Sequence, residues 1–494
     1  MPSFHVITFG CQMNQHDSAK MASLLVEAGF REVPEPETAR VIVVNTCSVR
    51  DKAEQKLRSE LGRLGIRKHA RPDMVLVVAG CMGSQHGDQL LKAVPELDLV
   101  IGPDNIAALP GLLADLELGG PRRAVTEHDL TQPRFLTTED AGQPAPPVAW
   151  VTTMKGCDER CSFCIVPQTR GPERYRPSGQ ILDEIATLVR GGCREVTLLG
   201  QTVNSYRDPT GSLPSAPEAG RTDWRSTTSA AARQDESEFA ALLFAIAERC
   251  PNLERLRYTS PHPRHLTRAL IAAHRNLPML CRHVHLPVQS GSDRVLKRMI
   301  RRYRVDEYLE RIEALREAVP GISLSTDVIV GFCGETEQDF RETLALIERV
   351  GFVGLFGFKY SPRPATAALR LSDDVPEPEK AARLHRLFEL SDRQRSQHLQ
   401  QLVGSRQRVL VEGRKPDGAY FGRTERNEIV HFGSRVDLVG TMVEVVIERA
   451  FKNSLAGELT DAASRLAASS LPRLDPSRRA RVDAPRQLTV LRWP

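Results

Sequence analysis

Three cysteines in one short stretch of the chain have the spacing to bind a metal. Cys157, Cys161 and Cys164, here called the loop cysteines, follow a strand-like run and are separated by three and then two residues. One loop can therefore turn three sulfur atoms toward a single centre. Structural zinc sites and cubane iron–sulfur clusters usually take four protein ligands, and the next cysteine is Cys193, inside the following unit. Three thiolates would leave one iron of a cluster open to a substrate. A zinc site or a chance grouping is the alternative.

A second set of cysteines lies nearer the start of the chain. Cys11, Cys47 and Cys81, here called the rim cysteines, each follow a short apolar run. The runs occupy residues 5–9, 41–44 and 74–79. Helical patterns separate them, which predicts a doubly wound parallel sheet. Because the carboxyl ends of parallel strands meet at one edge, the three thiols should line one rim. Three unrelated buried cysteines are an equally open reading.

The remaining cysteines have no spacing pattern. Cys193, Cys250, Cys281 and Cys333 are expected to be inert thiols. Ten cysteines in 494 residues are too few for a disulfide scaffold, and no secretory signal is visible, so reduced thiols in the cytoplasm are expected. No apolar stretch approaches the roughly 18 residues of a spanning helix, so no membrane association is expected.

The middle of the chain alternates strand-like runs with helical patterns. Six strands are expected, at residues 148–154, 195–199, 255–259, 283–288, 323–330 and 354–360. Helices are expected at residues 178–190, 239–249, 266–273, 306–318 and 337–350. Strands joined by right-handed helical crossovers predict a partial (β/α)6 barrel, whose functional face is formed by the carboxyl ends of the strands.

The chain is therefore expected to be an α/β multidomain protein. In order, its parts are an N-terminal sheet domain (1–125), a linker (126–147), the partial barrel (148–375) with an insertion at 207–238, a helical connector (376–403), a small β-barrel (404–464) and a basic disordered tail (465–494). The small barrel is predicted from strand-like runs at 407–412, 419–423, 428–432 and 442–450, which are separated by turns.

Charge gives little indication of a partner. The chain has 67 basic and 62 acidic residues, and the tail from residue 465 holds seven arginines against two aspartates. The rest of the chain is balanced, so composition alone does not indicate nucleic-acid binding. A basic run at 294–304 is either a phosphate-contacting surface or a solvated helix face.

Short runs throughout the chain match one known family. Besides the loop at 156–164, they are residues 10–14, 45–50, 52–56, 80–81, 165–167, 169–171, 198–201, 260–263, 285–292 and 358–364. The chain resembles the methylthiotransferase branch of the radical S-adenosylmethionine (SAM) enzymes over about residues 5–460, without the insertion and the tail. Runs 422–424 and 454–459 are similar to those of the TRAM RNA-binding domain. The chain departs from the family at Cys333, where a stiffer proline is usual.

This resemblance implies two cofactor sites and one reaction. The loop cysteines would hold a [4Fe–4S] cluster with SAM on its open iron, and the rim cysteines an auxiliary [4Fe–4S] cluster that carries sulfur. The implied reaction is methylthiolation of C2 of N6-isopentenyladenosine beside the anticodon of tRNA. Two SAM molecules would serve, one as methyl donor and one as the source of a 5′-deoxyadenosyl radical.

Two alternatives remain open at this stage. Another enzyme of the branch would modify threonylcarbamoyl-adenosine in tRNA or an aspartate of a ribosomal protein. A protein of a different class would be a non-catalytic iron–sulfur or zinc RNA-binding protein. The partners implied by the resemblance are the tRNA anticodon stem-loop, an electron donor of the flavodoxin or ferredoxin type and a sulfur donor. A monomer is expected.

Further residues are expected to contact SAM or RNA. Expected SAM contacts in the loop and at the strand ends are Phe163, Gln201, Ser260, Gln289 and Gly331, although turn formation alone could account for most of them. Expected RNA contacts are Arg298, Arg301, Arg302, Arg414, Lys415 and Arg423. Tyr420 and Phe421 would either stack on a base or belong to the core of the small barrel.

Overall fold

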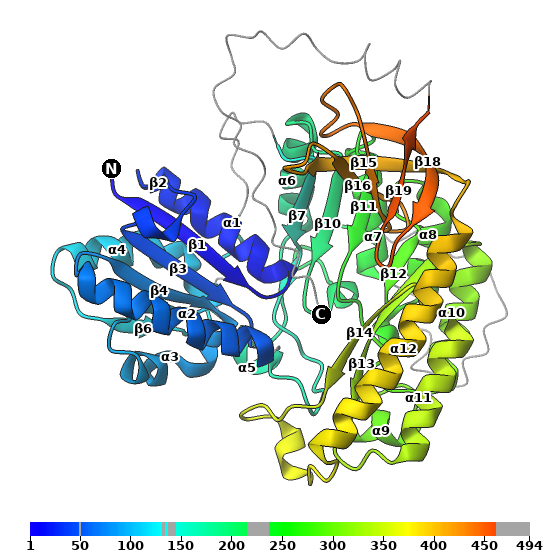
Figure 1. Ribbon diagram of the computed structural model, residues 1–494, viewed down its shortest axis with the longest axis horizontal. Coiled ribbons are helices and arrows are strands. Elements are labelled where there is room, and N and C mark those ends of the chain that lie inside the picture. The colour runs from blue at the N-terminus through cyan, green and yellow to red at the C-terminus, as the bar shows by residue number, and fades with distance from the viewer. Residues whose placement is uncertain (49–50, 131–133, 137–144, 215–236, 461–494) are drawn as a thin grey trace.

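The structure is a computed structural model that describes residues 1–48, 51–130, 134–136, 145–214 and 237–460. The predicted tail, most of the predicted insertion and part of the predicted linker lie outside the described residues. Three folded parts are present: a parallel sheet, a half barrel and a small closed barrel (Figure 1). The predicted α/β multidomain architecture is confirmed. None of the helices in the described ranges is long and apolar enough to cross a membrane.

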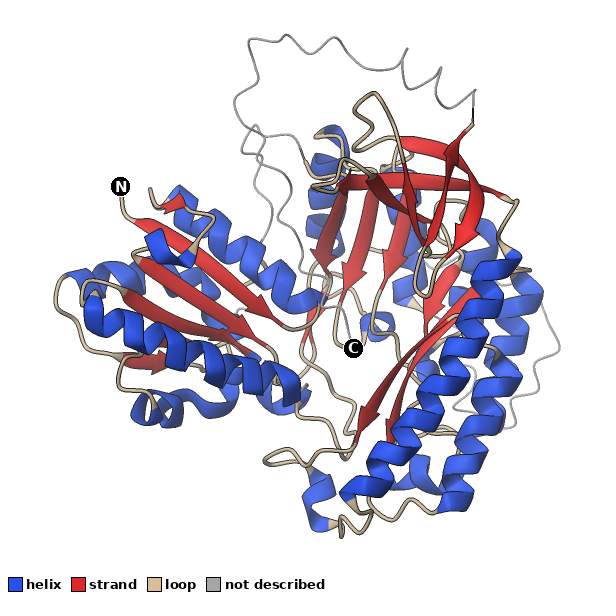
Figure 2. Cartoon of the chain, viewed as in Figure 1, coloured by secondary structure: helices blue, strands red, loops and turns tan. Residues whose placement is uncertain are grey.

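The N-terminal part is a six-stranded parallel sheet in the order β2-β1-β3-β4-β5-β6. Its strands are β1 (Ser3–Phe9), β2 (Arg31–Glu32), β3 (Val41–Thr46), β4 (Val75–Gly80), β5 (Leu99–Ile101) and β6 (Arg123–Val125). Both faces are apolar and covered by helices (Figure 2). One face packs against α1 (Gln12–Glu27) and α4 (Leu109–Glu117), the other against α2 (Asp51–Ala70) and α3 (Cys81–Ala93). The predicted doubly wound sheet is confirmed, with three additional short strands.

The half barrel contains six parallel strands in chain order. They are β7 (Val148–Thr152), β10 (Glu195–Leu199), β11 (Arg255–Tyr258), β12 (His283–His285), β13 (Ser323–Val330) and β14 (Gly354–Lys359). A bridge between Leu256 and Leu280 joins the two three-stranded halves. The outer helices are α6 (Ser178–Arg190), α7 (Glu238–Arg249), α8 (Arg268–Asn276), α10 (Val305–Ala318) and α11 (Glu337–Val350). All six predicted strands and five predicted helices are therefore present.

Shorter elements decorate the half barrel. They are the antiparallel pair β8 (Met154–Lys155) and β9 (Arg174–Tyr175), and the helices α5 (Val166–Arg170) and α9 (Asp293–Arg298). The half barrel also has short 3₁₀ helices at Val203–Ser205, Pro263–His265 and Ala367–Arg370, and the N-terminal sheet part has two at Pro36–Thr38 and Pro103–Ala108. The β8–α5 connection carries the loop cysteines.

The C-terminal part is a closed five-stranded barrel in the order β15-β16-β17-β19-β18. It follows helix α12 (Glu377–Gln401), which packs along β14. The strands are β15 (Arg406–Arg414), β16 (Tyr420–Thr424), β17 (Ile429–Phe432), β18 (Met442–Ala450) and β19 (Leu455–Leu459). Tyr420 is 2% exposed and stacks on Phe432, so it belongs to the core of this barrel.

The small barrel sits at the amino ends of the half-barrel strands. Arg255, the first residue of β11, donates to the backbone carbonyls of Arg408 and Arg423 at 2.7 and 2.6 Å. Arg257 donates to the carbonyl of Thr424 at 2.7 Å. Because the strands run away from this contact, their carboxyl ends lie at the far side of the half barrel (Figure 1).

Candidate metal centres

The rim cysteines lie at the carboxyl ends of three adjacent strands. Strand β3 pairs in parallel with β1 on one side and with β4 on the other. Cys11 caps the start of α1, Cys47 directly follows β3, and Cys81 is the first residue of α3. The fold thus brings three thiols that are far apart in the sequence to one edge of the sheet.

Two glycines and two asparagines let these strand ends come close together. A Cβ on Gly10 would lie 2.9 Å from the Cβ of Cys47. Gly80 has a φ of +91°, and a Cβ there would lie 2.2 Å from Oδ1 of Asn45. The Asn45 amide donates to the carbonyl of Asn14 at 2.8 Å, and the Asn14 amide donates to Oδ1 of Asn45 at 3.1 Å. This buried amide pair fixes the spacing of the backbone beneath the thiols.

The loop cysteines lie beyond the carboxyl end of β7. The backbone N–H of Cys157 donates to the carbonyl of Gly171 at 3.1 Å, which closes the base of the loop. The Cys157 sulfur lies 3.0 Å from the Thr202 hydroxyl. The Arg301 guanidinium donates to the sulfur of Cys161 at 3.3 Å. The loop is therefore tied to segments that follow two other half-barrel strands.

Burial raises the pKa of thiols in both sets. The pKa of Cys157 rises to about 11 and that of Cys164 to about 12, because burial disfavours the charged thiolate. Burial also raises the pKa of Cys81, with a smaller opposing effect from Arg170 and a reinforcing one from the nearby Cys11. These thiols must therefore lose protons when a metal centre binds. Three thiolates at each position fit a cubane iron–sulfur cluster with one open iron.

Arg170 connects the two cysteine sets. It is the last residue of α5, six positions after Cys164, and is 5% exposed. Its Nε donates to the sulfur of Cys81 at 3.3 Å, and its Nη2 donates to the carboxylate of Asp17 on α1 at 2.7 Å. The arrowheads of β1, β3 and β4 are directed toward α5 in Figure 1. A single side chain from the element after the loop cysteines thus reaches a rim cysteine.

Other contacts hold the N-terminal sheet against the half barrel. Lys20 on α1 is ion-paired with Glu184 on α6 at 3.3 Å, and both side chains are buried. His16 lies 3.4 Å from the hydroxyl of Thr152 at the end of β7. Together with Arg170, these contacts direct the carboxyl ends of both sheets toward each other.

Several of the expected SAM contacts have features of a ligand site. Within the described part of the chain, the Gln201 side-chain oxygen and nitrogen are buried with no hydrogen-bond partner, as is Nε2 of His262. Ser260 and Gln289 adopt φ values of +60° and +72°, a strained conformation that proteins retain where a ligand must be met. Gln201 precedes Thr202, which contacts Cys157. These orphaned groups fit the amino and carboxylate groups of SAM.

Comparison with known proteins agrees with this geometry. Residues 3–102 match the uncharacterized protein family UPF0004, residues 151–347 the Radical SAM superfamily and residues 400–460 the TRAM domain. A tRNA-2-methylthio-N(6)-dimethylallyladenosine synthase of Sorangium cellulosum is 59% identical over 94% of this chain and 94% of its own length. The synthase of Geobacter sulfurreducens is 44% identical over 92% of this chain and 97% of its own.

The chain belongs to the tRNA-2-methylthio-N(6)-dimethylallyladenosine synthase family. It is a radical SAM enzyme with a C-terminal TRAM domain. The resemblance recognised from the sequence is therefore confirmed. The matched ranges also correspond to the sheet, the half barrel and the small barrel in turn.

The remaining expected SAM contacts pack against protein. The ring of Phe163 lies edge-on to Phe332, with centroids 6.5 Å apart. Gly331 faces α12, where a Cβ would lie 2.3 Å from Cγ of Lys380. Close packing alone therefore accounts for glycine at this position.

The expected RNA contacts separate into two groups. Arg301 is 5% exposed and is directed at Cys161, and Arg298 donates to the carbonyl of Cys333 at 2.9 Å. Arg301 therefore supports the site from within, whereas Arg298 is half-buried and holds the loop that contains Cys333. Arg302 and Arg414 are exposed, whereas Lys415 and Arg423 are half-buried on the TRAM barrel.

Hydrogen bonds hold the loop that contains Cys333, the position where the family resemblance leads us to expect a proline. Arg298 holds the Cys333 carbonyl, and the Gly334 N–H donates to Asp374 at 2.6 Å. The Gly331 N–H donates to Glu335, also at 2.6 Å. The Cys333 thiol is fully buried in an apolar cluster with Phe332. Hydrogen bonds thus supply the rigidity that a proline ring would give.

One group beside the loop cysteines had not been predicted. A carboxylate oxygen of Glu159 and one nitrogen each of His262 and His265 lie within 4.8 Å of one another. Arg264 is 3.7 Å from Glu159. Burial raises the pKa of Glu159, but His265 and the nearby arginines together lower it by more, so the net shift is downward. The positive charge around Glu159 indicates that this group is an ion-pair network that anchors the cysteine loop. It is unfavourable for a cation site. The position of this carboxylate between Cys157 and Cys161 was the available signal.

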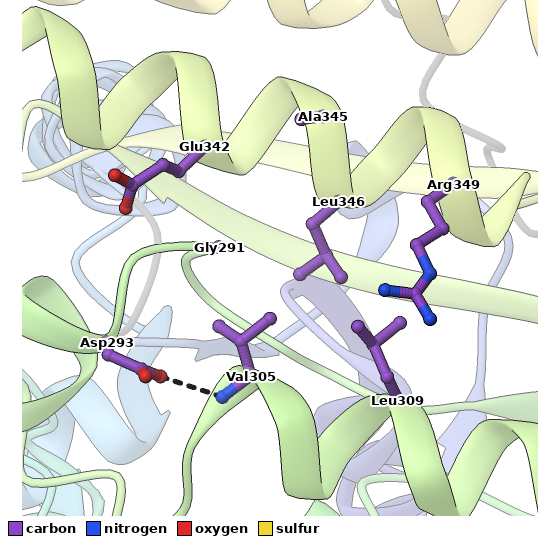
Figure 3. Close-up of a pocket in the computed structure, with 8 residues that line it drawn as sticks. All are labelled: Gly291, Asp293, Val305, Leu309, Glu342, Ala345, Leu346 and Arg349. Carbon is purple, nitrogen blue, oxygen red and sulfur yellow. Dashed lines mark hydrogen bonds between the residues drawn. The ribbon is translucent and has the colours of Figure 1, made fainter.

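A pocket of about 340 Å³ lies away from these residues, between α10 and α11 (Figure 3). It is lined by Gly291, Asp293, Val305, Leu309, Glu342, Ala345, Leu346 and Arg349. None of the predicted site residues lines it, so the pocket has no part in the site described here.

Proposed function

We propose that this enzyme adds a methylthio group to C2 of N6-isopentenyladenosine beside the anticodon of tRNA. The observation that carries the proposal is the contact of Arg170, from the element after the loop cysteines, with a rim cysteine. A reaction that brings sulfur and a radical to one carbon needs two centres at close range. The names of the two synthases to which the chain is similar supply the substrate class.

We assign one [4Fe–4S] cluster to the loop cysteines, with SAM at its open iron, and an auxiliary one to the rim cysteines. When bound, the clusters and two SAM molecules supply the electron, the radical that removes the C2 hydrogen, the methyl group and the sulfur atom. Gln201 and His262 offer buried polar atoms for SAM. Ser260 and Gln289 extend that contact at the neighbouring strand ends.

Two arginines tune the cysteine sets in this proposal. Arg301 donates to Cys161 and Arg170 to Cys81, both at 3.3 Å. Donors and positive charge beside a cluster sulfur stabilise the more reduced, more negative state. Burial of Cys47, Cys81 and Cys157 also limits access of water to reactive species. These residues therefore position and tune the centres without themselves reacting.

The proposal includes partners. A tRNA anticodon stem-loop would contact the TRAM barrel through Arg414, Lys415 and Arg423, with Arg302 nearer the cysteines. A flavodoxin or ferredoxin would supply electrons and a separate donor would supply sulfur. The enzyme would work as a monomer in the cytoplasm.

Nucleoside mass spectrometry of tRNA from cells lacking the protein tests the function. We expect the 2-methylthio group to be lost while the isopentenyl group remains. Re-expression of Cys47→Ala should not restore the modification, whereas Cys250→Ala, a buried thiol outside both sets, should restore it. Retention of the 2-methylthio group in the deletion strain, or its loss from a threonylcarbamoyl nucleoside instead, would contradict the proposal.

A further inference from the structure

The strands of the half barrel present two different faces. The helix-facing residues are aliphatic and buried, and include Val151, Leu198, Leu256, Val284, Val328 and Leu355. The inner face is defined here as the face opposite the helices. It carries the residues that are adjacent in sequence to these aliphatic ones: Trp150, Thr197, Arg257, His285, Asp327 and Phe356. Closed β/α barrels fill this face with branched aliphatic side chains that form a packed core. Arg257 on this face holds the TRAM barrel, whereas the polar and aromatic residues His285, Asp327 and Phe356 suit contact with a bound molecule.

Phe356 is the most exposed of these aromatic residues. It lies on β14, which pairs only with β13 among the described strands and so forms an edge of the sheet. The next residue, Gly357, faces α12, where a Cβ would lie 2.8 Å from Leu384. Since side chains alternate along a strand, the Phe356 ring projects from the opposite, inner face. It is 50% exposed there, which leaves the ring free to stack on a ligand.

Polar side chains are fixed beside the Phe356 ring. His285 lies edge-on to it, with ring centroids 5.8 Å apart. The His285 ring is held by Ser325 at 2.9 Å and by Asp327 at 3.3 Å. Asp327 is also the direct cross-strand neighbour of Phe356. A flat apolar surface next to a carboxylate and an imidazole matches a purine base, which stacks through its face and forms hydrogen bonds through its edge.

The TRAM barrel extends this surface toward solvent. Arg395 donates to the carbonyl of Val353, just before β14, at 3.4 Å and to Asn453 in the β18–β19 loop at 2.7 Å. The same loop carries Phe451, which is 49% exposed, and Lys452, whose side chain is 73% exposed and is ion-paired with Asp392 on α12 at 3.0 Å. An exposed aromatic ring next to a basic residue is typical of surfaces that follow single-stranded nucleic acid. Arg395 thus links the start of β14, the strand that carries Phe356, to the loop that carries Phe451.

We propose that Phe356, together with His285 and Asp327, forms the platform on which the base of the substrate adenosine stacks. The RNA strand enters along the β14 edge from the β18–β19 loop. This assignment rests on the proposed function and adds to it the residues that hold the base. Phe356 acts by binding, so its loss weakens RNA binding and raises KM.

A fluorescent base tests the platform directly. The full-length reconstituted enzyme with SAM is mixed with an anticodon stem-loop in which 2-aminopurine replaces the substrate adenosine, because stacking quenches this probe. We expect quenching by the wild type, loss of quenching with Phe356→Ala, and recovery with Phe356→Trp. Loss of one stacked base corresponds to roughly 5- to 150-fold weaker binding. Phe388→Ala is the matched control, since this 39% exposed ring packs on the opposite side of the same strand at Gly357.

The outcomes separate the two proposals. Suppose that the wild type modifies tRNA and that Phe356→Ala changes neither the probe fluorescence nor the affinity. This result would overturn the platform alone. Equal losses with Phe356→Ala and Phe388→Ala would also overturn it, since the effect would not be specific to the inner face. A wild type that binds no stem-loop would overturn both the platform and the proposed function.

Discussion

Replacing Arg170 with glutamine asks whether one side chain holds the two cysteine sets together. The substitution removes the 2.7 Å contact with Asp17 and the 3.3 Å contact with the Cys81 sulfur. It leaves a carboxylate that is 8% exposed without its cation. Breaking a buried pair in this way typically costs about 3–5 kcal/mol. The substitution lowers the free energy needed to separate α1 from α5 locally. Global stability changes less, because the rest of each domain keeps its own core.

Hydrogen exchange measured by mass spectrometry reports this separation. At 1.4 kcal/mol for each factor of ten, the loss predicts roughly 150- to 4,000-fold faster exchange in α1 and α5, up to the rate of unprotected amides. Arg123→Gln is the control, because its pair with Asp115 is substantially exposed and should contribute less than about 1 kcal/mol. Exchange in α1 and α5 should not change in that variant.

A double-mutant cycle decides whether the pair itself is responsible. If Asp17 and Arg170 stabilise each other, Asp17→Asn combined with Arg170→Gln should cost clearly less than the two single changes added together. Additive effects would refute the reasoning, because they would mean that the two residues act through separate contacts. Unchanged exchange in Arg170→Gln would refute it more simply.

Three further predictions concern the same region. Cys161→Ala should abolish reductive cleavage of SAM, whereas Cys47→Ala should retain cleavage, lose methylthio insertion and bind about four instead of about eight irons per chain after anaerobic reconstitution. Gly80→Ala should destabilise the chain by about 2–4 kcal/mol in chemical unfolding, because a φ of +91° is combined with a clash at Asn45. Gly119→Ala is the control: its φ is +87° but the space around it is open, so it should show the cost of backbone strain alone. Burial raises the pKa of Asp17, but its charged partners lower it more, so the net shift is downward. The stability that ionised Asp17 contributes is therefore present above pH 3.8 and is lost as the pH falls below that value. Between pH 5 and pH 3, the free energy of unfolding in urea should fall more in the wild type than in Asp17→Asn.

Much of the fold could be predicted because local patterns and tertiary structure agree. Strand β13 was predicted at its exact bounds, since its run is long and is followed by helix α11, which Thr336 caps at its N-terminus. Strands β2, β5 and β6 have only two or three residues, too few to show a period. Strand β19 was not predicted because Gly457 interrupts its pattern; a Cβ there would lie 2.0 Å from the carbonyl of Val446. That glycine reflects a contact with another strand, which the local sequence does not contain.

The candidate site was predictable to a different extent for each kind of residue. The cysteines were found because short regular spacing and repeated strand-end positions are both visible in the sequence itself. Arg301 was assigned to RNA because it lies in a basic run, yet its side chain is buried against Cys161. Arg170 was part of a recognised motif but received no role, since its partners come from residues 89 and 153 positions away in the chain. Contacts of that range become visible only once the domains are packed together.

The position of the TRAM barrel has a consequence for substrate size. It is attached at the amino ends of the half-barrel strands through Arg255 and Arg257, whereas every cysteine of both sets lies beyond carboxyl ends. A free nucleoside cannot touch both extremities at once, but a folded hairpin can span the length of the sheet. The enzyme would thereby select its substrate by size as well as by the identity of the base. A mononucleotide that carries the correct modification would be a poor ligand.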